Sequence, residues 1–376
     1  MSELRLHSEK LFDGEAYLED KVLTVCDGKL VAIDSDTARA DIRLDGLLVP
    51  GFVDLQVNGG GGVLFNAEPT PDGVKTMLIA HAQFGTTAML PTVITDKVEV
   101  MAQAADAVAQ LLKAGTPGLA GIHFEGPHLS AAKKGAHSQG FIREISEAEW
   151  QIYRRKDLGQ IIVTLAPETV SAGDIHTLVS LGVKVCLGHS NADYLCVRQA
   201  LLAGADGFTH LYNAMSPLQG REPGMVGAAL FHDEASCGII ADGFHLDDVC
   251  GRLALKVKPR DKVFLVTDAM QHVGCQQKEF AFFDRKITLT GGRLTSTTGE
   301  LAGSALDMAT AVKNAHLKLQ VPLDQALNMA SLNPARYINQ AQRGRIRVGD
   351  RADFAELSPD FKVLSTWIAG HRVFAA

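Results

Sequence analysis

Hydrophobic and polar positions in the middle of the chain follow two patterns that alternate with each other. Short runs rich in valine, isoleucine and leucine are typical of buried strands. They are followed by stretches such as 98–114 and 192–203, where apolar residues recur every three or four positions and predict amphipathic helices. The predicted strands are 47–58, 86–94, 118–125, 161–167, 183–189, 207–212, 236–242 and 262–268. Eight strand–helix units over about 290 residues favour a (β/α)8 barrel over an open doubly wound sheet.

Both ends of the chain have a different pattern, with short β segments separated by turns. Asp27-Gly28 stands between two apolar runs and is a strong hairpin signal. We therefore expect an α/β protein in which residues 49–343 form a TIM-like (β/α)8 barrel. Residues 1–48 and 344–376 are expected to pair into a small β-sandwich domain built from both chain termini. The other predicted elements are helices at 306–319 and 323–338 and a hairpin at 289–294.

Composition and charge narrow the classes of function. The chain has 376 residues, a formal net charge of −7 and a pI near 6.0. These values argue against nucleic acid as a partner, because nucleic-acid binding usually leaves a basic footprint. No segment has the apolar core of a signal peptide or the roughly 18 apolar residues of a membrane span, so no membrane partner is expected. The six cysteines show no CxxC spacing and are expected to be buried thiols, which predicts a cytoplasmic protein.

Four polar residues each follow an apolar predicted strand: Glu125, His189, His210 and Asp268. Taken singly, a histidine at a strand end is more often a structural residue than a ligand. In a parallel barrel, however, the carboxyl ends of the strands converge on one opening, where the chemistry takes place. A carboxylate with two imidazoles is a familiar catalytic zinc set. The pattern therefore predicts a site for a divalent metal, with Asp268 left free to act as a general base and acid.

Longer motifs surround these residues, among them His-Phe-Glu-Gly-Pro-His at 123–128 and Thr-Asp-Ala-Met at 267–270. The others lie at 50–59, 135–137, 188–190, 210–215, 242–245 and 301–304. In their order along the chain, these motifs resemble the amidohydrolase superfamily and, more closely, its N-acetylglucosamine-6-phosphate deacetylase family. The resemblance implies a hydrolase that removes an N-acetyl group from a phosphorylated amino sugar.

The resemblance also implies how the metal is held. Glu125, His189 and His210 match the metal ligands, with zinc the first expectation and iron, cobalt or manganese left open. Many amidohydrolases carry His-x-His on the first strand for a second metal, where this chain has Gln56 and Asn58. Neutral amides are weak ligands for a transition metal, so we expect these two to be a second-site remnant and one metal per subunit.

For the substrate, the resemblance implies His137 as the donor to the amide carbonyl and Asp268 as the proton carrier. Asn213, the backbone at Ala214, and Arg221 match phosphate contacts, and His245 matches a sugar or phosphate contact. The remaining substrate-binding expectations are Ala136, Leu301, Ala302 and Gly303. A homodimer or homotetramer is implied, in which Arg221 and His245 serve either their own or a neighbouring subunit's site.

The sequence leaves three other functions open. The first is the same reaction on N-acetylgalactosamine-6-phosphate, because sequence does not distinguish sugars that differ at one hydroxyl. The second is another amidohydrolase that acts on a small amide. The third is a barrel without activity that serves as a scaffold, which the full set of ligands and the acid–base carboxylate argue against.

Overall fold

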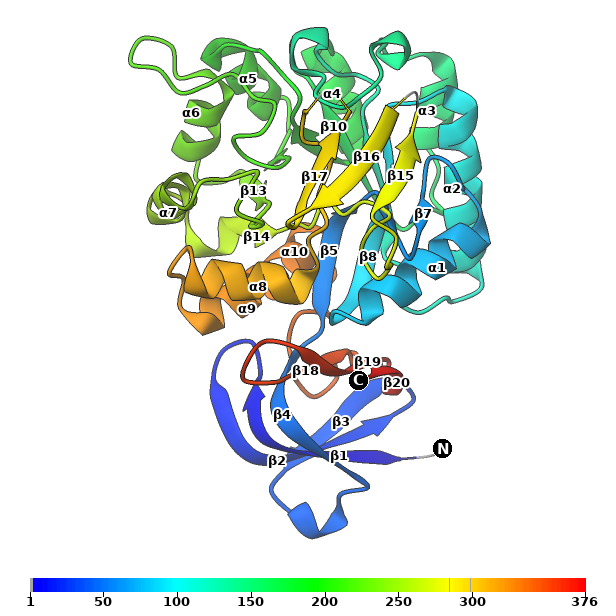
Figure 1. Cartoon of the computed structure of the whole chain (residues 1–376), viewed down its shortest axis with the longest axis vertical. Helices are drawn as coiled ribbons and strands as arrows, with labels where there is room; N and C mark the ends of the chain where they lie inside the picture. The colour runs from blue at the N-terminus through cyan, green and yellow to red at the C-terminus, as the bar shows by residue number, and fades with distance from the viewer. Residues whose placement is uncertain (1–2, 284, 298) are drawn as a thin grey trace.

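The computed structural model describes residues 3–283, 285–297 and 299–376. Residues 1 and 2, which begin the predicted small domain, fall outside these ranges, as do residues 284 and 298 within the predicted barrel. Figure 1 shows a barrel wrapped by helices and, below it, a separate sheet to which both ends of the chain contribute. The predicted fold class is confirmed.

The barrel consists of eight parallel strands in their order along the chain. They are β5 (Phe52–Val57), β8 (Thr86–Ile94), β9 (Gly121–Glu125), β10 (Gln160–Leu165), β11 (Lys184–Leu187), β12 (Gly207–Phe208), β13 (Ser236–Ile239) and β14 (Val263–Leu265). The chain after β14 closes the ring, because the Asp268 N–H donates to the Gln56 carbonyl at 2.9 Å. A parallel bridge between Val57 and Ala269 continues this contact. Almost every residue of these strands is buried, as expected for strands covered on both faces.

Helices cover the outside of the barrel (Figure 1). They are α1 (Pro71–Ala82), α2 (Val98–Lys113), α3 (Glu147–Tyr153), α4 (Ala172–Ser180), α5 (Tyr194–Leu202), α6 (Gly224–Phe231), α7 (Asp248–Val257), α8 (Met308–Leu317), α9 (Leu323–Ala330) and α10 (Leu332–Tyr337). Short 3-10 turns lie at Thr37–Arg39, Ala131–Lys133, Gln139–Phe141 and Arg260–Lys262. Several helices begin at a capping side chain; Asp193, for example, accepts the backbone N–H of Cys196 at the start of α5.

The helix predicted at 323–338 is instead two helices, α9 and α10. The break is at Ser331, whose φ of −130° and ψ of −72° are not helical. Pro334 explains it, because proline has no N–H to donate to the carbonyl of Ala330 and its ring crowds that position. The hydrophobic spacing continues across the break, which is why the pattern alone predicts a single helix.

The sheet below the barrel has seven strands in the order β20-β19-β18-β4-β1-β2-β3. Their bounds are β1 (Leu4–Phe12), β2 (Tyr17–Cys26), β3 (Lys29–Asp34), β4 (Ile42–Pro50), β18 (Phe354–Leu357), β19 (Val363–Ile368) and β20 (His371–Ala375). Asp27 and Gly28 turn the chain between β2 and β3 with φ values of 49° and 75°, as their hairpin signal predicts. Strand β4 stays in this sheet up to Pro50, so the strand predicted at 47–58 is instead two strands, and the first barrel strand begins at Phe52.

Two small antiparallel sheets complete the fold. Strands β6 (Gly59–Gly60) and β7 (Val63–Leu64) form a tight hairpin, which explains the run of four glycines. Strands β15 (Glu279–Phe282), β16 (Arg285–Thr290) and β17 (Arg293–Ser296) form a three-stranded sheet, here called the lid sheet, and the predicted hairpin at 289–294 is its β16–β17 turn. Figure 1 shows the lid sheet, in yellow, in front of the barrel. Its side chains Phe282 and Leu294 pack in one cluster with Ile94 of β8.

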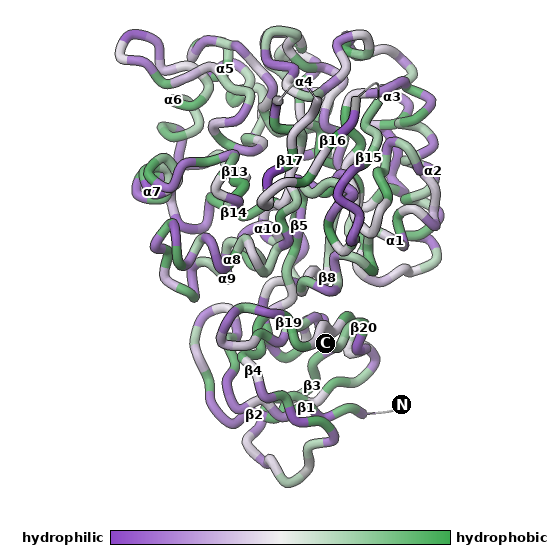
Figure 2. Tube along the Cα trace, in the orientation of Figure 1, coloured by the Kyte–Doolittle hydropathy of each residue, from purple (hydrophilic) through white to green (hydrophobic). Residues whose placement is uncertain are grey.

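Hydrophobic and hydrophilic residues alternate along the outer elements in Figure 2, as expected of helices and strands with one buried face. In the described part of the chain, no helix combines the length and the apolar character needed to cross a bilayer.

Candidate active site

The ends of four barrel strands bring the predicted chemical groups to one place. Glu125 is the last residue of β9, and His189, His210 and Asp268 follow β11, β12 and β14 within three residues. The last three residues have positive φ angles of 48°, 34° and 52°. This left-handed conformation costs a non-glycine residue on the order of 1–3 kcal/mol and often marks a functional site. The backbone thus turns at each strand end and directs the side chain towards the barrel opening.

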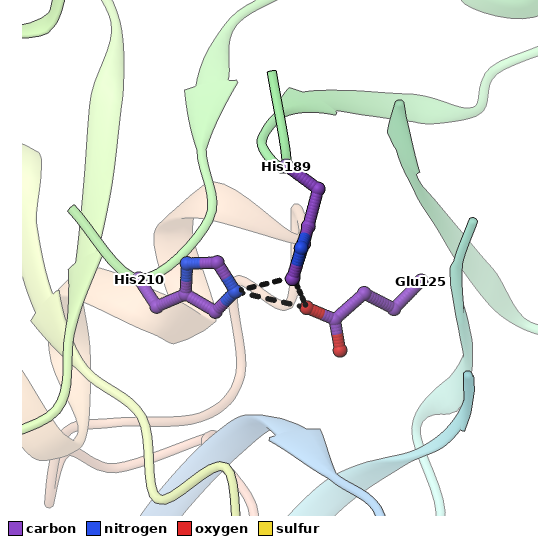
Figure 3. Close-up of side chains that lie close together, drawn as sticks. All are labelled: Glu125, His189 and His210. Carbon is purple, nitrogen blue, oxygen red and sulfur yellow. Dashed lines mark hydrogen bonds and ion pairs between the residues drawn. The ribbon is translucent and has the colours of Figure 1, made fainter. Parts of the chain in front are cut away.

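Glu125, His189 and His210 converge on one point (Figure 3). The Oε1 atom of Glu125 lies 3.2 Å from Nε2 of His189 and 3.0 Å from Nε2 of His210, and the two Nε2 atoms are 3.0 Å apart. All three residues are buried. In a tetrahedral zinc site with bonds of about 2.0–2.1 Å, neighbouring ligand atoms are roughly 3.3 Å apart. The three atoms therefore fit the ligand set of one divalent metal.

The protonation of these groups also suits a metal. Nδ1 of His189 lies 2.9 Å from the carbonyl oxygen of Lys133, which can only accept, so Nδ1 carries the proton and Nε2 is free to coordinate. Burial alone would raise the pKa of Glu125, but the facing imidazoles of His189 and His210 hold this pKa well below its usual range. The site thus keeps a buried carboxylate charged, which a cation would stabilise further.

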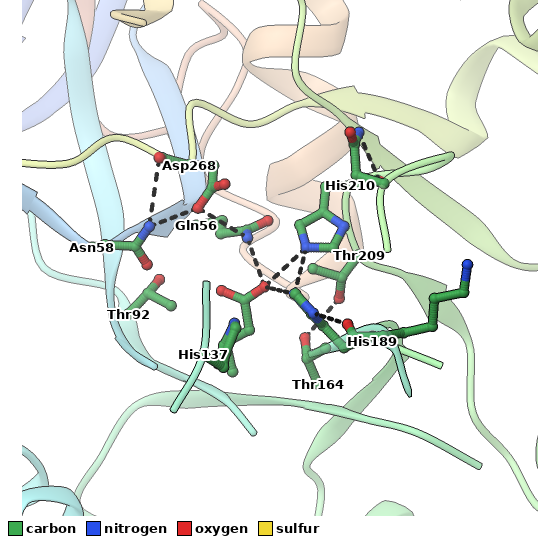
Figure 4. Close-up of polar contacts among 12 residues, drawn as sticks. Gln56, Asn58, Thr92, His137, Thr164, His189, Thr209, His210 and Asp268 are labelled. Atoms are coloured by element: carbon green, nitrogen blue, oxygen red, sulfur yellow. Dashed lines mark hydrogen bonds and ion pairs between the residues drawn. The ribbon is translucent and has the colours of Figure 1, made fainter. Parts of the chain in front are cut away.

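Asp268 stands beside this cluster and is held by two side-chain amides, that of Gln56 on β5 and that of Asn58 directly after it (Figure 4). The side-chain amide of Asn58 donates to Oδ1 of Asp268 at 2.6 Å, and that of Gln56 donates to the same atom at 3.3 Å. Gln56 also donates to Oε1 of Glu125 at 3.1 Å. Gln56 and Asn58 therefore orient both carboxylates through their N–H groups, and the second oxygen of Asp268 is left for proton transfer.

The pKa of Asp268 is raised to about 6. The main cause is burial, which disfavours the charged carboxylate, and the nearby Glu125 carboxylate adds to it. A carboxyl group whose pKa lies near neutrality can both take up and release a proton under physiological conditions. This is the behaviour expected of a general base that later becomes a general acid.

His137 approaches the same space from the loop after β9. Its Nδ1 accepts the backbone N–H of Thr95 at 3.3 Å, and the Thr95 hydroxyl oxygen lies 2.8 Å away. Burial, and then the nearby His189, lowers the pKa of His137 to about 3, so the ring is neutral. A neutral ring that accepts at Nδ1 carries its proton on Nε2, which makes Nε2–H a donor for a substrate oxygen.

A second layer of polar residues supports the strand ends from below (Figure 4). Nδ1 of His123 lies 2.9 Å from the carbonyl of Leu55 and must donate to it, so its Nε2 accepts from the Thr164 hydroxyl at 2.8 Å. Thr164 in turn contacts the hydroxyl of Thr209 at 2.6 Å. Because Thr209 precedes His210 and His123 lies on β9 with Glu125, this chain of hydrogen bonds fixes two of the ligand-bearing segments together.

These groups surround a pocket of about 190 Å³. The predicted residues that line it are Asn58, Glu125, Ala136, His137, His189, His210, Asn213, Ala214, His245, Asp268, Leu301 and Gly303. Ala302 lies behind its two neighbours in an apolar cluster, and Gln56 is buried next to Asp268 rather than on the wall. Arg221 is exposed in the loop before α6 and does not line this pocket.

His245 lines the pocket of its own chain and is fixed by Asp242. Its Nδ1 lies 2.7 Å from Oδ2 of Asp242, and its backbone N–H donates to Oδ1 at 2.8 Å. Burial would raise the pKa of Asp242, but these contacts hold it below the usual range. The Asp242 carboxylate thus orients the His245 ring so that Nε2 is the nitrogen available to a ligand.

Four residues of the pocket wall were not predicted from the sequence: Ile94, Gly135, Met270 and Phe282. Gly135 and Met270 belong to the quoted motifs, so their position beside His137 and Asp268 was a usable signal. Ile94 and Phe282 carried none, because an apolar residue on a strand is indistinguishable from core in a single sequence. His128, in contrast, is purely structural: its ring contacts the carbonyl of Arg143 and the hydroxyl of Tyr153.

Comparison with known proteins agrees with this site. Residues 47–373 match the amidohydrolase family. An N-acetylgalactosamine-6-phosphate deacetylase of Shewanella sp. (strain ANA-3) is 51% identical over 331 residues, which are 88% of this chain and 84% of that protein. An N-acetylglucosamine-6-phosphate deacetylase of Vibrio furnissii is 35% identical over 382 residues, which are 98% of this chain and 94% of that protein.

Comparison with solved structures also points to the deacetylases. The crystal structure of N-acetylglucosamine-6-phosphate deacetylase from Pasteurella multocida has a TM-score of 0.95 to this chain at 36% identity, and the match covers 100% of both chains. The chain therefore belongs to the amidohydrolase family and, within it, to the group formed by the N-acetylglucosamine-6-phosphate and N-acetylgalactosamine-6-phosphate deacetylases.

Proposed function

We propose that this enzyme hydrolyses N-acetylglucosamine-6-phosphate to glucosamine-6-phosphate and acetate. The observation that carries the proposal is the position of Asp268, a carboxylate of raised pKa beside a three-ligand metal site and inside the same pocket as the neutral donor His137. Such a set suits the hydrolysis of an amide, which needs an activated water, a stabilised oxyanion and a protonated leaving amine.

Glu125, His189 and His210 would hold one divalent metal, for which we propose zinc, with iron, cobalt or manganese as alternatives. When bound, the metal would lower the pKa of a water molecule and polarise the amide carbonyl. Oδ2 of Asp268 takes the proton of the attacking water. The same oxygen then delivers that proton to the amide nitrogen, so that the amine leaves uncharged. Nε2–H of His137 donates to the carbonyl oxygen as negative charge develops on it.

Acid is expected to inactivate this reaction. As the pH falls through the pKa of Asp268, the carboxylate takes up a proton and can no longer act as a base, so kcat/KM should fall about tenfold per pH unit. Because a bound dication favours the charged carboxylate, a pH of about 6 is the upper limit of this transition. The measurement is a pH profile of kcat/KM with the metal content determined at each pH. A kcat/KM that shows no acid limb while the metal stays bound would contradict the assignment.

We propose that the sugar phosphate lies at the end of the pocket formed by Asn213, Ala214 and His245, with Ala136, Leu301 and Gly303 along the sugar. Among the described wall residues, none is a lysine or an arginine. A phosphate needs a cation of fixed geometry, and an arginine fork suits it well. We therefore propose that Arg221 of the partner subunit completes this site in a homodimer or homotetramer.

Arg221→Ala is expected to raise KM for the phosphorylated sugar by about tenfold or more while kcat changes little, because a charged hydrogen bond to the phosphate is lost. The exposed Lys113 at the end of α2 offers a matched control, and Lys113→Ala should leave KM unchanged. The difference between wild type and Arg221→Ala should vanish on the unphosphorylated sugar. If the variant lost the same factor on both sugars, a phosphate contact would be excluded.

One observation favours a second substrate. The relative that is 51% identical to this chain is an N-acetylgalactosamine-6-phosphate deacetylase, whereas the N-acetylglucosamine-6-phosphate deacetylase of Vibrio furnissii is 35% identical. Acetate release from both sugar phosphates and from an unrelated small amide, measured side by side, tests the assignment. We expect a clear preference for the phosphorylated sugars over the amide. Activity on the amide alone would overturn the proposed function.

Two further features are proposed with it. The six cysteines are unpaired, which supports a reducing compartment and a cytoplasmic location. The chain is proposed to divide into a barrel domain at 49–343 and a small domain from 1–48 and 344–376. An apolar cluster formed only by residues of the terminal segments supports this division.

A further inference from the structure

One wall of the pocket is apolar, although the reaction proposed above uses only polar groups. It is formed by Ile94, Met270 and Phe282, whose exposed fractions are 6%, 1% and 3%. The three side chains belong to one cluster with Leu64 and residues of the lid sheet, and Ala136 packs against it. A buried apolar wall beside a metal site suits an apolar part of the substrate.

The apolar wall and the proposed phosphate end lie on opposite sides of the barrel opening. Ile94 ends β8, and Asn213 and Ala214 follow β12. In the ring of eight strands, β8 and β12 are four strands apart and therefore on opposite sides of the opening. Glu125 ends β9 and Asp268 follows β14, and these two strands lie between the two sides. A substrate whose phosphate lies near Ala214 thus has its other end against the apolar wall.

The geometry of an amide then assigns the group that meets this wall. The carbonyl carbon has three substituents in one plane: the oxygen, the nitrogen and the methyl group. With the carbon beside Asp268, the oxygen points to His137 and the nitrogen leads to the sugar. The methyl group takes the remaining direction. We propose, on the basis of the proposed function, that Ile94, Met270 and Phe282 form an acyl pocket that fits the acetyl methyl and excludes longer chains.

The apolar wall is rigid enough to limit the length of the acyl group that fits against it. Gly303 has a φ of 61°, and a Cβ atom built there would lie 2.5 Å from Cγ of Met270, so the backbone packs directly on this side chain. The Met270 N–H also donates to the carbonyl of Ser304 at 2.9 Å. Met270 has little room to move aside for an added methylene.

Phe282 closes the other side of the acyl pocket. It lines the reaction pocket and also a neighbouring cavity of about 710 Å³, which reaches Gln139, Phe141 and Phe283. The Phe282 side chain is therefore part of the wall between the two spaces, together with Ala136 and His137. Its removal would join them and give a longer acyl chain room to extend.

The test compares N-acetyl, N-propionyl and N-butanoyl derivatives of the better hexosamine-6-phosphate. Wild type is expected to prefer acetyl over propionyl by about 10–200-fold in kcat/KM, the range for one added methylene in a tight pocket. Ile94→Ala and Phe282→Ala should each narrow this ratio by about tenfold or more, and Phe282→Ala should also admit the butanoyl group. Leu294→Ala is the matched control, because Leu294 lies in the same cluster but does not line the pocket.

The ratio of kcat/KM for the acetyl and propionyl substrates does not change when part of the enzyme is unfolded, because such a loss lowers both rates by the same factor. The proposal is supported if the ratio narrows in Ile94→Ala and Phe282→Ala and keeps its wild-type value in Leu294→Ala. It is overturned if wild type accepts all three acyl groups equally, or if the two wall variants keep the wild-type ratio. Absence of acetate release by wild type would instead contradict the proposed function, and the acyl pocket with it.

Discussion

Asp268→Asn is expected to reduce kcat by at least about a thousandfold while the enzyme keeps its bound metal. Proton transfer by a positioned group contributes about a hundredfold to ten-thousandfold, and Asp268 acts twice, first as base and then as acid. An amide at this position can still accept the N–H of Asn58 through its oxygen, so the side chain keeps its place. Because Asp268 is not one of the three metal ligands, metal content should remain at the wild-type value.

The measurement is steady-state hydrolysis of the sugar phosphate together with elemental analysis of the same sample. Asp242→Asn serves as a control, because Asp242 is a partly buried carboxylate that follows a barrel strand but contacts His245 rather than the reacting amide. It should mainly change KM. Near-normal turnover of Asp268→Asn would remove this residue from the mechanism.

His210→Ala is expected to lose both the metal and nearly all activity. The change removes one of three ligands and leaves the Glu125 carboxylate buried with a single imidazole. A catalytic metal held by only two protein ligands is bound much more weakly, so metal content should fall well below one per chain. Catalysis should fall by at least the factor expected for Asp268→Asn, because water activation is lost as well.

His245→Asn gives the matched comparison for this loss. His245 lines the same pocket but lies outside the cluster of Glu125, His189 and His210. It should therefore keep its metal. Elemental analysis after dialysis against a metal-free buffer measures the difference. A metal content of one per chain in His210→Ala would contradict the ligand assignment.

The sequence was sufficient to predict the barrel and the centre of the site, for a physical reason. Glu125, His189, His210 and Asp268 follow separate apolar runs, and parallel strands of one barrel must bring such positions to the same end. The Asp27-Gly28 turn was predictable for a local reason, because this dipeptide adopts the backbone angles that the turn requires.

Other features depended on contacts between distant residues and could not be predicted. Gln56 and Asn58 were expected only as the remnant of a second metal site, and their role as donors to Glu125 and Asp268 follows only from the closure of the barrel. The position of Phe282 on the pocket wall depends on how the lid sheet folds back over β8. Arg221 is the reverse case, because its residue type fits a phosphate but its side chain is exposed and does not line the pocket of its own chain.

The most direct test of the central claim is a crystal structure of the metal-loaded enzyme with anomalous scattering data collected at the absorption edge of the bound metal. One strong peak is expected per chain, about 2.0–2.3 Å from Oε1 of Glu125 and from Nε2 of His189 and His210. The amides of Gln56 and Asn58 should contact carboxylates rather than a second metal. A peak located elsewhere, or a second peak of equal height at Gln56 and Asn58, would contradict the single-metal account of this active site.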